Sequence, residues 1–106
     1  MIFKLFDSSV STDFAAKLVA ELQTAWPPSR LDGNGKSFER RREQAAAAMV
    51  SRARAQARET RMNVYQKAKV GPALSKALVD EGYAADFAEA VSGEVVRAVA
   101  AASASA

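Results

Sequence analysis

The fold of this chain is decided by its middle third, where residues 37–69 read SFERRREQAAAAMVSRARAQARETRMNVYQKAK. From Phe38 to Lys69 this stretch holds no glycine or proline, and good helix formers dominate it. Small or apolar residues recur at helical spacing along one stripe: Phe38, Ala45, Met49, Ala53, Ala57, Val64 and Ala68. The pattern predicts one continuous helix over 37–69, which at a rise of about 1.5 Å per residue would span roughly 50 Å.

A shorter helix is expected before this one, over residues 11–26. Ser11 or Thr12 can serve as its N-cap, and the two prolines at 27–28 end it because proline lacks a donor N–H and clashes with the preceding turn. Its inward residues recur at helical spacing: Phe14, Ala15, Leu18, Val19, Leu22 and Trp26. Trp26 is interpreted as a core or hydrophobic-staple residue rather than a ligand site. Residues 27–36 contain turn-forming residues and are expected to form a loop.

Two further helices are predicted after the long one, over residues 72–81 and 84–101. Gly71 and Pro72 are expected to separate two helices, because glycine is common directly after the end of a helix and proline is common at the first position of the next helix. Gly82 is expected to end the next helix in a left-handed conformation. The inward residues would be Leu74, Ala77 and Leu78 on the first of these helices, and Phe87, Val91, Val95 and Val99 on the second.

The expected architecture is all-α, with four helices in a single bundle-like domain over residues 1–106 and one long central helix. An apolar N-terminal arm over 1–10 and a frayed Ala/Ser tail over 102–106 would flank the bundle. Alanine accounts for 24 residues, and it favours helices but buries little area. The core of one chain would therefore be thin, and we expect a homodimer to complete it.

The chain contains neither cysteine nor histidine. Disulfides, thiolate nucleophiles, Cys/His zinc sites and Ser-His-Asp catalysis are thereby excluded, and no cofactor or metal is expected. No apolar run approaches the roughly 20 residues that a membrane span needs, and the N-terminus does not resemble a signal peptide. We therefore expect a cytoplasmic protein without membrane contact.

Charge is distributed unevenly along the chain. Residues 44–79 carry seven cations against Glu59 alone, whereas residues 80–96 carry five anions and no cation. Five side chains of the predicted long helix step by three or four residues and would share one face: Arg54, Arg58, Arg61, Tyr65 and Lys69. This face is a candidate surface for a polyanion or a protein partner. Nucleic-acid phosphates could neutralise it, with Tyr65 available for base stacking.

The same basic face has two simpler interpretations. Solvent alone could surround it, or the acidic residues of 80–96 could neutralise it from within the protein or the dimer. The turns at Gly71-Pro72 and Gly82 would let the acidic segment fold back onto it. Because the two opposite charges nearly match, the sequence favours internal neutralisation.

A second, weaker candidate lies at the predicted start of the long helix. Gly35-Lys36-Ser37 resembles the end of a phosphate-binding P-loop, but Arg30 stands where the first glycine of that motif is required. Free N–H groups at this helix start, together with Lys36, Ser37 and Arg40, could still hold an anion. The alternative is a plain loop in which Ser37 caps the helix.

No motif in the sequence specifies a catalytic activity. We therefore expect a non-catalytic interaction or regulatory protein that acts through helix surfaces, as a homodimer and with a protein partner that the sequence does not identify. The alternative is a nucleic-acid-binding accessory protein that uses the basic face. A small enzyme is the third alternative.

Overall fold

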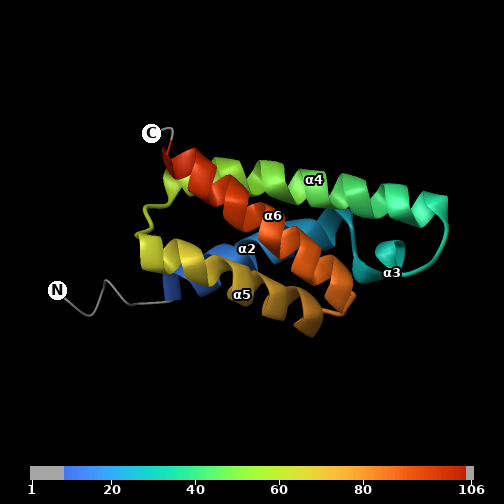
Figure 1. The fold of residues 1–106 in the computed structure, drawn as a ribbon. Helices are drawn as coiled ribbons and strands as arrows, with labels where there is room; N and C mark the ends of the chain where they lie inside the picture. The colour runs from blue at the N-terminus through green and yellow to red at the C-terminus, as the bar shows by residue number, and fades with distance from the viewer. Residues whose placement is uncertain (1–8, 105–106) are drawn as a thin grey trace.

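The computed structural model describes residues 9–104, and 85% of these are helical. The helices are α2 (Ser9–Ala25), α3 (Pro28–Leu31), α4 (Lys36–Glu59), α5 (Val64–Asp80) and α6 (Ala85–Ala104). No strand occurs within the described range (Figure 1). The predicted all-α class is confirmed. Within the same range, no helix combines the length and apolarity needed to cross a bilayer.

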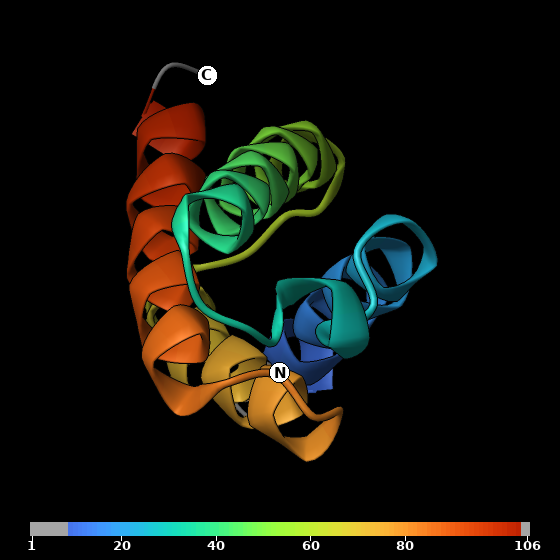
Figure 2. The same ribbon diagram turned by 90° about the vertical axis from the view of Figure 1, so that its right-hand side faces the viewer.

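The four longer helices pack as a bundle around one apolar core. α2 packs on α5, α5 on α6, and α6 on α4, whereas α2 and α4 meet far less closely. Figure 2 shows these helices as an open ring, with the widest spacing between α4 and α2. The core contains most of the predicted inward residues of α2, α5 and α6: Phe14, Ala15, Leu18, Val19, Leu22, Leu74, Leu78, Phe87, Val91, Val95 and Val99. Trp26 and Ala77, also predicted to face inward, are only partly buried against it. Three sides of the bundle are therefore closed, and the fourth is not.

The predicted single helix over 37–69 is wrong, because two helices occupy this stretch. α4 ends at Glu59, and α5 begins at Val64 after a short connection. The side chain of Asn63 accepts a hydrogen bond from the Gln66 backbone N–H at 2.8 Å, and the Gln66 side chain accepts one from the Asn63 N–H at 3.0 Å. This capping box starts a new helix and provides hydrogen-bond acceptors for backbone N–H groups that have no partner within the helix. The chain then reverses, so that α5 packs on α2 and α6.

The break changes which members of the predicted apolar stripe are buried. The α4 members are buried as predicted: Ala45, Met49, Ala53 and Ala57. Phe38 is only half-buried, and Val64 and Ala68 are exposed. Because α5 begins its own helical phase, its buried line runs through other residues: Gln66, Val70, Leu74 and Leu78.

Gly71 and Pro72 do not separate two helices, as the sequence predicted; α5 passes through both. Val70 and Leu74 lie on either side of the proline, and both are fully buried, so a continuous helix keeps both in the core. A Cβ atom on Gly71 would lie 2.9 Å from Cγ2 of Val96, which makes this glycine a point of close approach between α5 and α6. Tertiary packing therefore stabilises a helix that its own proline opposes.

Gly82 ends α5 as predicted, with a φ of 99°. Its N–H donates to the carbonyl of Val79, and the N–H of Tyr83 donates to the carbonyl of Leu78, each at 3.0 Å. This pair of bonds is a Schellman motif, in which glycine supplies the left-handed turn. The motif reverses the chain and lays α6 against α5.

Several predicted boundaries need correction. α2 begins at Ser9, and Ser11 is not its cap: the Ser11 hydroxyl is buried and donates to the carbonyl of Gln66 at 2.6 Å. The predicted loop over 27–36 contains the short helix α3. Gly35, not Ser37, occupies the N-cap of α4, with no side-chain cap bond. α6 continues beyond 101 to Ala104, and the rest of the predicted arm and tail, 1–8 and 105–106, lies outside the described residues.

Candidate functional site

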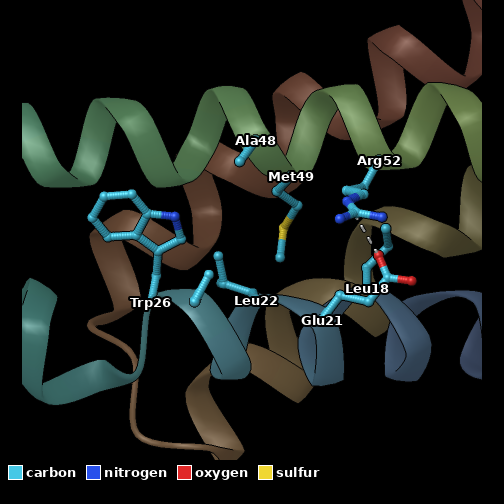
Figure 3. A pocket seen from close by; sticks show the side chains of 8 residues that line it. Leu18, Glu21, Leu22, Trp26, Ala48, Met49 and Arg52 are labelled. Atoms are coloured by element: carbon cyan, nitrogen blue, oxygen red, sulfur yellow. Dashed lines mark ion pairs between the residues drawn. The ribbon is translucent and has the colours of Figure 1, made fainter.

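The seam between α2 and α4 contains a partly open cavity of about 100 Å³ (Figure 3). We call it the α2–α4 groove and define it by the residues that line it: Leu18, Glu21, Leu22, Ala25, Trp26, Ala48, Met49 and Arg52. It lies where the bundle is least closely packed. An apolar cavity of about 150 Å³ in a protein core can bind benzene, so this groove has room for one modest apolar side chain.

The groove has an apolar floor and one charged end. Leu18, Leu22 and Met49 are buried and form the floor. Figure 3 shows the Met49 side chain reaching from α4 toward α2, with Trp26 at one end of the groove. At the other end, Arg52 Nε lies 3.9 Å from Glu21 Oε2, and these side chains are 70% and 33% exposed. An ion pair this long and this exposed contributes about 0–1 kcal/mol and does not close the groove.

Trp26 is held in the wall of the groove by Tyr83 and Arg30. The Tyr83 hydroxyl donates to the Trp26 carbonyl at 2.7 Å, which ties this wall to the turn between α5 and α6. The Arg30 guanidinium lies 4.9 Å from the centroid of the Trp26 ring, and it donates to the carbonyl of Ala25 at 3.0 Å. Sequence reasoning assigned Trp26 to the core or to a hydrophobic staple, and the structure shows it half-buried and packed against the edge of the core.

The Tyr83 hydroxyl makes the fold sensitive to high pH. Burial raises its pKa to about 12, and the negative charge of Glu81 adds to this effect. The unfolded chain releases this proton near pH 10, while the folded chain keeps it, so the unfolding free energy should fall as pH rises from about 10 to about 12. Urea denaturation across this range should show a loss of up to about 2 kcal/mol attributable to Tyr83.

The matched variant for this prediction is Tyr83→Phe, which removes the titrating group and keeps the ring. It should lose about 1 kcal/mol at neutral pH, because the Trp26 carbonyl loses its donor. Its stability should then decline less steeply than that of the wild type above pH 10. Equal slopes for the two proteins would contradict the assignment of the alkaline transition to Tyr83.

Beyond Arg52, a buried polar residue bridges the same two helices. Gln56 on α4 donates from Nε2 to the carbonyl of Phe14 on α2 at 3.3 Å. Its Oε1 is buried and has no hydrogen-bond partner among the described residues. Besides their apolar core contacts, α2 and α4 are therefore joined by this amide hydrogen bond and by the long Arg52–Glu21 ion pair. Sequence reasoning missed Gln56, because a single polar residue within an alanine stripe gives no distinct pattern.

The five residues of the predicted basic face do not share a helix. Arg54 and Arg58 lie on α4, Arg61 lies in the connection, and Tyr65 and Lys69 lie on α5. All five are exposed, and they lie within about two helical turns of the α4–α5 connection along the chain. Lys69 Nζ lies 5.3 Å from the centroid of the Tyr65 ring. We call these five residues the basic corner.

The acidic residues of α5 and α6 form no ion pair with the basic corner over the described residues 9–104. The ion pairs found over residues 9–104 are Arg52–Glu21 and Lys76–Asp80, and neither involves a cation of the corner. Glu94 borders a surface hollow with Arg54 but forms no ion pair with it. Internal neutralisation by direct ion pairs is thus not seen in the single chain, and neutralisation at longer range or within a dimer stays a prediction.

The weak anion candidate lies at the start of α4. Lys36, Ser37 and Arg40 are all exposed there, and Glu39 lies in the same first turn. An acidic side chain at this position competes with an anion for the free N–H groups. The anion site remains a prediction that rests on the sequence alone.

The candidate functional sites of the described residues are contact surfaces rather than metal centres. Over residues 9–104, no group of three or more acidic side chains is placed to hold a metal ion. The α2–α4 groove and the basic corner are the two surfaces with features that suit a partner. No protein-family model matches this chain, and no curated protein or solved structure shows significant similarity to it.

Proposed function

We propose that this chain is a non-catalytic interaction protein and that the α2–α4 groove is its contact surface for another helical polypeptide. The observation that carries this proposal is the loosely packed seam: three sides of the bundle are closed by helix packing, while the fourth contains a partly open cavity lined mainly by apolar residues. The occupant that we infer is the same groove of a second copy, which makes the protein a homodimer.

The charges of the groove favour a second copy as its occupant. In a two-fold dimer the same surface of each copy faces that of the other, so a residue that contacts a second residue across the interface does so twice. Such an interface is favourable when the surface carries charges of both signs that can pair in this way. Glu21 and Arg52 are the charged residues that line the groove, and they carry opposite signs. A two-fold arrangement can therefore pair Glu21 of each copy with Arg52 of the other.

The shape and composition of the groove support the same arrangement. Ala25 and Ala48 are exposed at its edges, and their small side chains permit close approach of a second pair of helices. Covering Trp26, Ala25 and Ala48, which are exposed or half-buried, would add apolar burial to a core that is rich in alanine and thin. Dimerisation would thus close the fourth side of each bundle.

Light scattering tests this proposal, because the monomer mass is 11.3 kDa. The wild type should be a dimer at micromolar concentration. Ala48→Arg places a long cation in the groove and should give a monomer that remains helical by circular dichroism. Ala47→Arg is the matched control, since Ala47 is also exposed on α4 but does not line the groove, and it should remain dimeric.

Trp26 provides a second, independent readout, because it is the only tryptophan in the chain and it lines the groove. Its emission should shift to longer wavelength when dilution or Ala48→Arg separates the copies. A wild-type monomer across the whole concentration range would refute the dimer. A dimer that survives Ala48→Arg unchanged would place its interface elsewhere.

A further inference from the structure

We infer that the basic corner binds single-stranded nucleic acid through the phosphate backbone, with Tyr65 stacking on a base. This inference goes beyond the proposed function and does not depend on the groove. Its first support is the local charge: residues 53–69 carry Arg54, Arg58, Arg61, Lys67 and Lys69 against Glu59 alone. The fold concentrates these charges by reversing the chain between α4 and α5, at one end of the bundle (Figure 1).

The second support is that these cations are unpaired in the folded chain. None of the five forms an ion pair with a residue of the described range. Arg54, Arg58 and Arg61 are exposed, and like charges at such helical spacings repel one another mildly. A polyanion that neutralises them also releases its own condensed counterions, and this release drives the binding.

The third support is the apolar and aromatic surface beside the cations. In the described part of the chain, three large hydrophobic residues are exposed: Val64, Tyr65 and Val79. Two of the three begin α5, next to Arg61. Tyr65 is 38% exposed and already carries the Lys69 ammonium near its ring. A half-exposed ring among cations is the arrangement on which unstacked bases are held in single-strand binding proteins.

The geometry favours a single strand over a duplex. Duplex recognition commonly lays a straight helix or a ribbon into the major groove, with the contacting side chains in line along it. The break at 60–63 interrupts such a line, because the basic residues come from two helices and their connection. A compact cluster of this kind suits a few nucleotides whose backbone bends around it and whose bases are free to stack.

Fluorescence anisotropy with a labelled thymidine strand of about 12 nucleotides tests this inference, with the same strand in duplex form as comparison. The single strand should bind more tightly than the duplex and tighter than about 1 μM at physiological salt, which exceeds the usual non-specific range of roughly 10⁻⁴ to 10⁻⁶ M. If four phosphates are neutralised, affinity should fall about 50-fold between about 50 and 200 mM salt.

Two triple variants remove equal charge from different places. Arg54→Ala, Arg58→Ala and Arg61→Ala together should weaken binding at least about 30-fold and reduce the salt slope by about 2. Lys17→Ala, Arg30→Ala and Lys76→Ala remove three exposed cations that lie outside both the corner and the candidate anion site, and together they should change affinity less than about threefold. Circular dichroism confirms that both proteins are folded.

Variants of Tyr65 distinguish the contribution of base stacking to binding from that of charge. Tyr65→Ala should weaken binding of the strand about tenfold, whereas Tyr65→Phe keeps the ring and should bind like the wild type. Ala48→Arg should also bind like the wild type, so a failure of the proposed dimer is distinguishable from a failure of this inference.

Four results would overturn the inference. They are wild-type affinity no better than non-specific binding, equal losses in the two triple variants, duplex binding as tight as single-strand binding, and equal losses for Tyr65→Ala and Tyr65→Phe. Competition by polyglutamate as effective as by the unlabelled strand would likewise overturn it, in favour of an acidic polypeptide partner.

Discussion

Phe87→Ala is expected to lower the free energy of unfolding by about 3–5 kcal/mol. Phe87 is 8% exposed and begins the buried line of α6 that continues through Val91 and Val95. Its ring stacks on Tyr83, with 5.9 Å between the ring centroids. Alanine would remove most of this buried ring and leave a cavity, because the neighbouring helices are held apart by their own contacts.

Urea denaturation followed by circular dichroism measures this loss. Val79→Ala is the control, because Val79 is 46% exposed on α5 and its truncation should cost well under 1 kcal/mol. A loss below about 1 kcal/mol for Phe87→Ala would mean that α6 docks on α4 and α5 in some other way. Should the chain be dimeric, both proteins need to be compared at one concentration, since dimer stability depends on it.

Apolar spacing was sufficient to predict α2 and α6, because both helices bury one regular stripe from end to end. Phe14, Leu18 and Leu22 on α2 are buried as that spacing requires. Gly82 was equally predictable, since a Schellman turn needs a left-handed residue and glycine supplies it at least cost. In these elements the local sequence and the tertiary packing favour the same structure.

The break between α4 and α5 was missed, because every residue of 60–63 tolerates a helix. The local signal was nevertheless present: Asn63 precedes Gln66 by three residues, which is the spacing of a capping box. The prediction followed the uninterrupted run of helix-forming residues rather than this capping signal. Once the break was missed, Val64 and Ala68 were assigned to the core in error.

Of the two candidate surfaces, the basic corner could be predicted in part from the sequence, whereas the α2–α4 groove could not. The exposed cations of the basic corner were identified by charge alone, but their grouping at one end of the bundle depends on the chain reversal. The α2–α4 groove has no sequence signature. Leu18, Leu22 and Met49 look like ordinary core residues, and only the relative placement of two whole helices decides that their seam stays open.

Pro72→Ala is expected to stabilise the fold by about 2–3 kcal/mol. Pro72 lies in the interior of α5, where it cannot donate to the carbonyl of Ala68 and its ring crowds that carbonyl. Its side chain is exposed, so alanine sacrifices little packing. Part of the gain is offset because proline also restricts the unfolded chain, by about 0.4–1 kcal/mol.

Thermal denaturation followed by far-ultraviolet circular dichroism should show this gain as a rise of about 8–20 °C in the midpoint. Pro28→Ala is the matched control, because Pro28 is the first residue of α3, a position where the missing N–H has no helical partner to lose. That variant should be unchanged or slightly less stable. A destabilising effect of Pro72→Ala would instead mean that α5 is interrupted near Pro72 in solution. Two shorter helices, rather than one continuous helix, would then have to account for the close approach of Gly71 to Val96.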